Sequence, residues 1–385
     1  MALSYARSRN TDFGPGRRPN VSCLSPWIRH RLISEQEVVS TALKAHSFDQ
    51  AEKFIQEVCW RTYFKGWLEQ RPQVWTAYCA DRDAALETLE SHEAMLAEYN
   101  AAIEGRTGIE GFDDWAKELV STGYLHNHAR MWFASIWIFT LRLPWELGAD
   151  FFLRHLIDGD AASNTLSWRW VAGLHTKGKT YLARRSNIET YTDGRFGPTG
   201  LASEAHPIKG YENPARQSLR AGESVPTEPF ILLLTEDDLT PEQLLPETAR
   251  VEGVLGIASP TSRSPRRIGD AALRFATISV ADTTQRVADH FGVSGETVEE
   301  PGQLAAVAKE LAGDKRVRTI AMPYMPIGWT KDALSPHLND LRKNGYRIAQ
   351  IRRPWDDAFW PHARAGYFRL KKTIPENLRS LGLPV

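Results

Sequence analysis

The hydrophobic pattern of this chain changes once, and that change limits the folds open to it. From about Ser34 to Arg185, apolar and aromatic residues recur at three- and four-residue spacing, as in AEKFIQEVCWRTYFKGWL, which is typical of amphipathic helices. A Gly- and Pro-rich stretch follows, and after it short aliphatic runs alternate with helical stretches. We therefore predict a mainly α-helical domain over residues 1–195, a linker or surface arm over 196–228, and an α/β domain over 229–385.

The C-terminal part is expected to contain a Rossmann-like parallel sheet. Its strand candidates are PFILLLT, VEGVLGIAS, RTIAMPY and YRIAQIRR, and helical stretches such as PGQLAAVAKELAG and ALSPHLNDLRKNG stand between them. The run GVLGIAS lacks the glycine spacing of a dinucleotide-binding fingerprint, so no NAD site is expected.

Charge and composition exclude several classes of protein. The chain has 47 basic and 47 acidic residues, so any contact with nucleic acid has to come from a local patch. Its three cysteines are one short of an iron–sulfur cluster and fit a reducing compartment. The N-terminus has no signal-like apolar core, and the most apolar segment, Met131 to Leu143, is shorter than the ~20 residues of a membrane span. We expect a cytoplasmic monomer without a membrane segment or metal.

The segment EVCWRTYF places Glu57, Trp60, Arg61 and Phe64 on one helical face. A core face does not normally carry two charges, so a functional face is one interpretation. The alternative is an amphipathic helix at the edge of the core with a surface ion pair.

The segment HLIDGDAASNTLSWRW places Asp158 and Asp160 on either side of Gly159, in a turn between two helices. Helix capping accounts for one of these acids but not for the Asn and two Trp residues that follow. Upstream, GYLHNHARM supplies Arg130, whose charge suits one of these carboxylates. His126 and His128 in that segment are two residues apart, which makes them poor joint metal ligands.

Two further segments suit phosphate groups. The segment LSPW, Leu24 to Trp27, is expected where a loop meets the first helix, and Ser22 and Ser25 supply hydroxyl groups there. Hydroxyl and backbone N–H groups at a helix start suit phosphate, although N-capping is the common role of such serines. The stretch LHTKGKTYLARRSN gathers basic residues that suit DNA phosphates, with a solvated loop as the alternative. These basic residues are Lys177, Lys179, Arg184 and Arg185.

Taken in order, these motifs resemble the helical FAD-binding domain of the DNA photolyase and cryptochrome family, over roughly the first half of the chain. The resemblance implies FAD as cofactor. Arg130 and Asp158 match the ion pair beside the flavin ring, and Val21 replaces a Thr of the phosphate loop. The residues that the resemblance assigns to FAD are Tyr5, Val21, Ser22, Cys23, Leu24, Ser25, Arg61, Arg130, Asp158, Gly159, Asp160 and Asn164.

The same resemblance implies a pocket for a cyclobutane pyrimidine dimer flipped out of UV-damaged DNA. Its residues, which carry the catalytic role, are Glu57, Trp60, Asn127, Met131 and Trp170. Two indole rings can sandwich an unstacked dinucleotide, and Glu and Asn side chains can hydrogen-bond to base edges. Photolyases are a general example of enzymes that flip bases out of the duplex. Family members that act on the 6-4 photoproduct have H-H-x-x-R-H at the HNHARM position, so Asn127 and Met131 favour the cyclobutane dimer.

The resemblance implies that Asn164 faces flavin N5. Repair enzymes of the family have Asn at this position, whereas cryptochromes have Asp or Cys. Trp168 and Trp145 match inner members of the family's electron-transfer chain, with core packing as the alternative. The expected outer Trp falls near His92, and Tyr99 or Trp115 are the candidates to replace it.

The domain order is unusual for the family, whose α/β antenna domain precedes the helical domain. The C-terminal half is interpreted as a permuted antenna domain or an unrelated α/β module, and the sequence does not identify an antenna chromophore. The leading hypothesis is a deoxyribodipyrimidine photolyase, which repairs cyclobutane dimers by light-driven electron transfer from reduced FAD. The alternatives are a cryptochrome-like photosensory flavoprotein without repair activity, and a light-independent flavoprotein or DNA-binding module.

Overall fold

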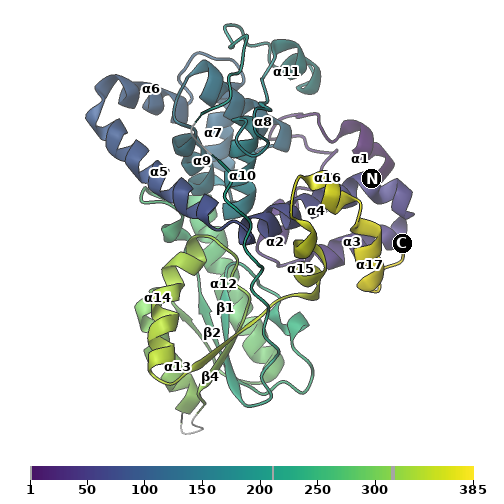
Figure 1. The fold of residues 1–385 in the computed structure, drawn as a ribbon, viewed down its shortest axis with the longest axis vertical. Coiled ribbons are helices and arrows are strands. Elements are labelled where there is room, and N and C mark those ends of the chain that lie inside the picture. Colours follow the sequence, from purple (N-terminus) through teal and green to yellow (C-terminus); the bar gives the residue numbers. More distant parts are fainter. Residues whose placement is uncertain (1, 210–211, 314–316) are drawn as a thin grey trace.

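The computed structural model describes residues 2–209, 212–313 and 317–385. In Figure 1 a helical half occupies the upper and right-hand parts, and a smaller half built on a sheet lies below it. The helices before the sheet are α1 (Ala2–Ser8), α2 (Ser25–Arg29), α3 (Glu35–Ala45), α4 (Phe48–Glu69), α5 (Gln73–Ser91), α6 (Glu93–Ile103), α7 (Phe112–Thr122), α8 (Asn127–Ser135), α9 (Trp145–His155), α10 (Ala161–Val171) and α11 (Arg185–Tyr191).

Helix α4 is the element that carries the EVCWRTYF face, and its start is fixed by a capping box. The Ser47 side chain accepts a hydrogen bond from the Gln50 backbone, and the Gln50 side chain accepts one from the Ser47 backbone. The helix then runs for 22 residues. Because a turn takes 3.6 residues, Glu57, Arg61 and Lys65 lie one turn apart on the same face.

The apolar run from Met131 to Leu143 forms α8 followed by a π-helical segment, Ile136–Thr140. Trp132, Phe133, Ile136 and Trp137 are fully buried here, so the expected buried helix exists but continues as a π segment. Among the described residues, no helix is long and apolar enough to span a bilayer, and no cluster of His, Cys, Asp and Glu is arranged to hold a metal ion.

The C-terminal half has a parallel five-stranded sheet in the order β3-β2-β1-β4-β5, which confirms the predicted Rossmann-like class. The strands are β1 (Phe230–Thr235), β2 (Val251–Ile257), β3 (Gly295–Val298), β4 (Thr319–Pro323) and β5 (Arg347–Ile351). The four expected strands are present. Strand β3 is not predicted from the hydrophobic pattern, because this short edge strand is mostly polar and exposed.

Helices cover both faces of the sheet, as expected of a doubly wound fold. Alternate residues of β1 point to opposite faces: Ile231 and Leu233 pack with α13 and α14, whereas Phe230, Leu232 and Leu234 pack with α12. These helices are α12 (Asp270–Phe291), α13 (Leu304–Ala312) and α14 (Trp329–Lys343). The segment over 192–229 has no helix or strand in its described part.

The last helices return to the helical half, where they lie beside α3 and α4 in Figure 1. They are α15 (Pro354–Phe359), α16 (Tyr367–Lys371) and α17 (Ile374–Ser380). Trp355, Phe359, Tyr367, Leu370 and Leu378 belong to the same buried cluster as the helices that precede the sheet. Residues beyond about 353 therefore pack in the helical core, and the division at 1–195, 196–228 and 229–385 stays a prediction.

Candidate functional site

The turn between α9 and α10 presents two buried carboxylates. Asp160 caps α10, because its Oδ1 accepts a hydrogen bond of 2.6 Å from the Ser163 backbone. Asp158 accepts a hydrogen bond of 3.0 Å from Arg130, and its Oδ2 lies 3.9 Å from an Arg61 nitrogen. The pairing of Arg130 with one of these acids, expected from the sequence, is therefore present.

Neighbouring cations keep both carboxylates ionised. Burial by itself raises the pKa of each acid. For Asp158 the charges of Arg130 and Arg61 outweigh burial, so its pKa is lowered. For Asp160 the charge of Lys65, 3.9 Å away, and that of Arg61 lower the pKa to about 2. The turn is thus a fixed anionic site surrounded by guanidinium and ammonium groups.

Side chains from both halves of the chain hold the backbone of this turn. Arg29 Nε donates a 2.7 Å hydrogen bond to the Gly159 carbonyl oxygen. Arg263 Nη1 donates one of 3.1 Å to the Leu156 carbonyl oxygen. His30 Nε2 lies 3.2 Å from the Ile157 carbonyl oxygen. Arg29 and His30 come from the start of the chain, whereas Arg263 follows β2, so the turn lies between the two halves.

Glu236, directly after β1, connects these residues. Its carbonyl oxygen accepts a 2.9 Å hydrogen bond from Arg29 and lies 2.6 Å from His30 Nδ1. Its fully buried carboxylate accepts hydrogen bonds from the Trp329 indole, at 3.0 Å, and from the Ser259 backbone. The carboxyl end of the central strand is therefore bonded to the segment that holds the acidic turn.

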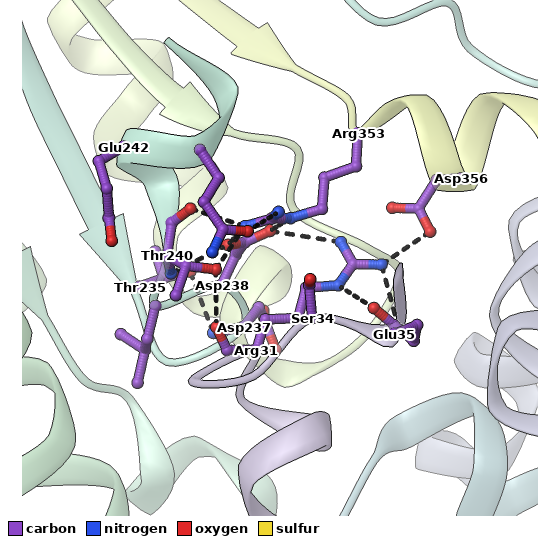
Figure 2. A network of polar contacts seen from close by, with 12 residues as sticks. Arg31, Ser34, Glu35, Thr235, Asp237, Asp238, Thr240, Glu242, Arg353 and Asp356 are labelled. Carbon is purple, nitrogen blue, oxygen red and sulfur yellow. Dashed lines mark hydrogen bonds and ion pairs between the residues drawn. The ribbon is translucent and has the colours of Figure 1, made fainter. Parts of the chain in front are cut away.

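A second buried network joins the two halves beside this one (Figure 2). Asp238 accepts two hydrogen bonds of 2.6 Å from Arg353, and Arg31 donates to it at 3.3 Å. Arg31 also contacts Asp356 at 2.7 Å and Glu35 at 3.1 Å. Asp238 follows β1 and Arg353 follows β5, so the carboxyl edge of the sheet is bonded to the helical half at two places.

The residues assigned to a lesion pocket lie on α4, α8 and α10. Glu57 is ion-paired with Arg9 at 3.3 Å, and burial raises the pKa of its carboxyl. Asn127, the first residue of α8, is exposed, and Met131 is half-buried one turn later. The set therefore combines solvent-accessible polar groups with half-buried apolar ones.

The two indoles of that set each lie against a tyrosine. Trp60 is stacked on Tyr367 of α16, with ring centroids 3.6 Å apart and planes 13° from parallel. Trp170 is stacked on Tyr181 at 5.5 Å. The helical spacing around Trp60 does not predict the contact with Tyr367, because that residue lies at the far end of the chain.

The residues assigned to phosphate binding are split between two places. Tyr5 packs edge-on against Phe54 of α4, with ring centroids 5.4 Å apart. The run of Val21, Ser22, Cys23, Leu24 and Ser25 is half-buried immediately before and at the start of α2. Within this run the Ser22 hydroxyl accepts a 3.4 Å hydrogen bond from the Leu24 backbone.

The tryptophans assigned to electron transfer are buried in the helical core. Trp168 lies 6.3 Å from Trp137, whose ring is 5.9 Å from Tyr99. Trp145 contacts Tyr78 at 5.6 Å. The other candidate, Trp115, is stacked on Trp132, and His92 is exposed. Trp168 and Tyr99 are thus joined by ring contacts through Trp137.

Asn164 is buried on α10, and its amide nitrogen donates a 2.9 Å hydrogen bond to the Ala149 carbonyl. This contact fixes the orientation of the amide. Lys177, Lys179, Arg184 and Arg185 are all exposed. Lys177 is paired with Glu212 at 3.2 Å and Arg185 with Glu189 at 2.8 Å.

Sequence reasoning missed several residues of the site: Lys65, Arg29, His30, Arg263 and Glu236. A signal existed for Lys65, which follows Glu57 and Arg61 at four-residue spacing on α4. No comparable spacing points to the others, because each of their contacts joins segments far apart in the sequence.

The site contains buried polar atoms without a partner among the described residues. One is Arg61 Nη1 and another is the Ser163 hydroxyl. A buried donor without a partner costs about 1–3 kcal/mol, so their presence beside the acidic turn fits a bound polar group. Guanidinium and hydroxyl groups together with ionised acids suit a cofactor that carries phosphates, hydroxyls and ring N–H groups, as FAD does.

Comparisons with known proteins agree with this chemistry. Residues 54–199 match the family described as the FAD-binding domain of DNA photolyase. The deoxyribodipyrimidine photo-lyase of Streptomyces griseus is 34% identical over 156 residues, which are 40% of this chain and 32% of the relative. That of Neurospora crassa is 33% identical over 186 residues, or 46% of this chain and 29% of the relative.

Among solved structures, a bacterial class III photolyase from Agrobacterium tumefaciens has a TM-score of 0.41 and 25% identity, covering 49% of this chain and 39% of that one. The chain thus spans well under half the length of these relatives. The matched segment includes α8, the acidic turn and α10, where the buried ion pairs lie. Residues 54–199 are therefore similar to the FAD-binding domain of DNA photolyase, and this similarity supports FAD as the cofactor of the segment.

Proposed function

We propose that this protein is a deoxyribodipyrimidine photolyase that repairs cyclobutane pyrimidine dimers in UV-damaged DNA under light. The observation that carries the proposal is the pairing of the partly buried Arg130 and Arg61 with the buried Asp158, inside the segment that matches the FAD-binding domain of DNA photolyase. Bound reduced FAD would supply the electron that opens the dimer and take it back afterwards.

In this proposal the chain's own residues hold and orient the cofactor. Asp160, kept ionised by its cations, would accept a hydrogen bond from the ring edge. The ion pair of Arg130 and Asp158 would lie beside the ring, and the unpartnered nitrogen of Arg61 would donate to the cofactor. Asn164 donates to Ala149 through its nitrogen, which leaves its amide oxygen as the side able to accept a ring N–H. Tyr5 and the 21–25 run are proposed to bind the phosphates.

The lesion is proposed to enter beside α4 and α10. The elevated pKa of Glu57 favours a carboxyl that shares a proton with a base carbonyl, and Asn127 offers an amide to a base edge. Trp60, Met131 and Trp170 supply apolar walls that exclude water from the dimer. Lys177, Lys179, Arg184 and Arg185 are proposed to bind the flanking phosphates.

A photosensory role without repair is the second candidate, and one observation favours it. Trp60 and Trp170 each have a tyrosine stacked on the indole, which leaves less indole surface for an unstacked base. Trp168 and Trp145 are proposed to carry electrons in either case.

The deciding experiment uses the full chain purified in the dark. Its absorption spectrum is recorded, and the protein is then illuminated with a reductant and an oligonucleotide that contains one thymine dimer. Light-dependent recovery of the ultraviolet absorbance of the bases is expected. Flavin bands that respond to light without any base recovery would favour the sensor, and a chain purified without flavin that also takes up none would refute both.

Two variants test the site itself. Asp158→Asn removes the charge that pairs with Arg130 and Arg61, so we expect flavin to be lost on dilution. Asp340→Asn is the control, because the Asp340 side chain is 63% exposed and its carboxylate pairs with the exposed Lys343 on α14. Equal flavin content in both variants would show that the acidic turn does not hold the cofactor.

A further inference from the structure

The segment around α16 carries an unusual combination of an exposed aromatic ring and basic residues. Phe368 is 76% exposed, the highest value among the exposed large apolar residues described. Arg364, Arg369 and Lys372 are also exposed, and residues 364–372 include no acid. We call these four residues the α16 patch. Exposed aromatic rings beside cations suit a partner with both flat apolar surfaces and negative charge.

The patch is held rigidly against the helical half. Its neighbour Tyr367 is buried, stacks on Trp60 and donates a 2.7 Å hydrogen bond from its hydroxyl to the Gln56 carbonyl. Leu370, on the same short helix, is fully buried. Because the buried Tyr367 and Leu370 fix the position of α16, the exposed Phe368 ring extends from a helix that is packed in place.

The patch lies beside the proposed lesion pocket. Tyr367 contacts Trp60 directly, and Tyr63, one turn along α4, donates a 2.8 Å hydrogen bond to the Ala365 carbonyl. The same Tyr63 hydroxyl lies 3.0 Å from His175 Nε2, at the start of the basic loop that contains Lys177. The segment that carries the patch and the start of the basic loop therefore both contact the Tyr63 hydroxyl on α4.

We propose that the α16 patch is a DNA contact beside the lesion pocket. Phe368 stacks on a base next to the gap that an extruded dinucleotide leaves in the duplex, and Arg364, Arg369 and Lys372 bind the adjacent phosphates. This inference rests on the proposed function. Duplex DNA is favoured over a lipid surface, because lipid recognition by charge takes a cluster of about four to eight cations and this patch has fewer.

The test compares exposed residues whose replacement should leave the fold intact. Phe368→Ser removes the ring, and Arg369→Ala with Lys372→Ala removes two cations. Ile278→Ser on α12 is the matched control, because Ile278 is also largely exposed, at 59%, but lies on the sheet half. Affinity is measured by fluorescence anisotropy for a duplex with one thymine dimer and for the same duplex undamaged, between about 50 and 200 mM salt.

Phe368→Ser is expected to weaken binding of the dimer duplex about tenfold, and to change binding of undamaged duplex much less, because that duplex has no gap. The double variant is expected to weaken both and to reduce the salt slope by about two. Ile278→Ser is expected to bind as the unchanged protein does.

The outcomes separate this inference from the proposed function. A dimer preference that Phe368→Ser leaves unchanged, or an equal loss for both duplexes, would overturn the patch while the proposed function stands. An unchanged protein with neither dimer preference nor repair would refute the proposed function, and the patch would fail with it. A Phe368→Ser variant that loses only binding to vesicles of phosphatidylcholine and phosphatidylserine, or only self-association, would assign the patch to that partner and refute the DNA contact.

Discussion

Replacing Asp238 with Asn should destabilise the whole protein, because this carboxylate neutralises two buried guanidinium groups. Asp238 receives two hydrogen bonds from Arg353 and one from Arg31, and the three side chains are 3–7% exposed. The substitution keeps the size of the side chain but removes its charge, so Arg353 retains mainly hydroxyl and carbonyl partners. Arg31 keeps Glu35 and Asp356.

Removing one charged partner of a buried ion pair lowers the free energy of unfolding by about 3–5 kcal/mol. The Asn oxygen still accepts one hydrogen bond and Arg31 keeps two other carboxylates, so we expect the lower end, about 3 kcal/mol. The free energy of unfolding is measured by urea denaturation. Asp340→Asn is again the control, with an expected change under about 0.5 kcal/mol, because exposed pairs contribute little. A change below about 1 kcal/mol for Asp238→Asn would refute the reasoning.

The stability that Asp238 contributes should also depend on pH in a defined direction. The charges of Arg353 and Arg31 outweigh burial and lower the pKa of Asp238 in the folded protein. An acid whose folded pKa lies below its unfolded value of about 3.9 contributes stability that is fully present above that pH and is lost as the pH falls through the folded pKa. We expect the stability difference between the unchanged protein and Asp238→Asn to be constant near neutral pH and to shrink below about pH 4.

Two further predictions concern α9 and α10. A Cβ on Gly148 would lie 2.3 Å from the Trp168 ring, whereas one on Gly302 would meet nothing within 4 Å. Gly148→Ala is therefore expected to cost about 1–3 kcal/mol in urea unfolding and Gly302→Ala almost nothing, and equal stabilities would contradict the packing described. Asp160→Ala removes the α10 cap and leaves Lys65 without its nearest partner, so we expect a loss of at least about 2 kcal/mol near neutral pH. Because the folded pKa of Asp160 is about 2, its contribution should persist to about pH 4 and fade only in stronger acid, which a urea series at several pH values would check.

The sequence predicted what depends on local patterns. Helical periodicity and aliphatic runs identified the helices and four strands, and Arg130 was matched to Asp158 because both lie in recognisable segments. The contacts of Asp238 with Arg353 and of Trp60 with Tyr367 join residues more than a hundred positions apart. The hydrophobic periodicity of the sequence does not predict such contacts, since they depend on how α15–α17 pack against the helical core.

The contacts at the carboxyl edge of the sheet bear on what the α/β half does. In doubly wound sheets, ligands bind outside the carboxyl ends of the strands, near the point where the strand order reverses. Here that point lies between β1 and β4, and Arg29 and His30 already bond to Glu236, directly after β1. A chromophore placed there would have to displace buried hydrogen bonds that also hold the acidic turn. The arrangement therefore favours an α/β half that supports the acidic turn over one that uses this edge for a ligand of its own.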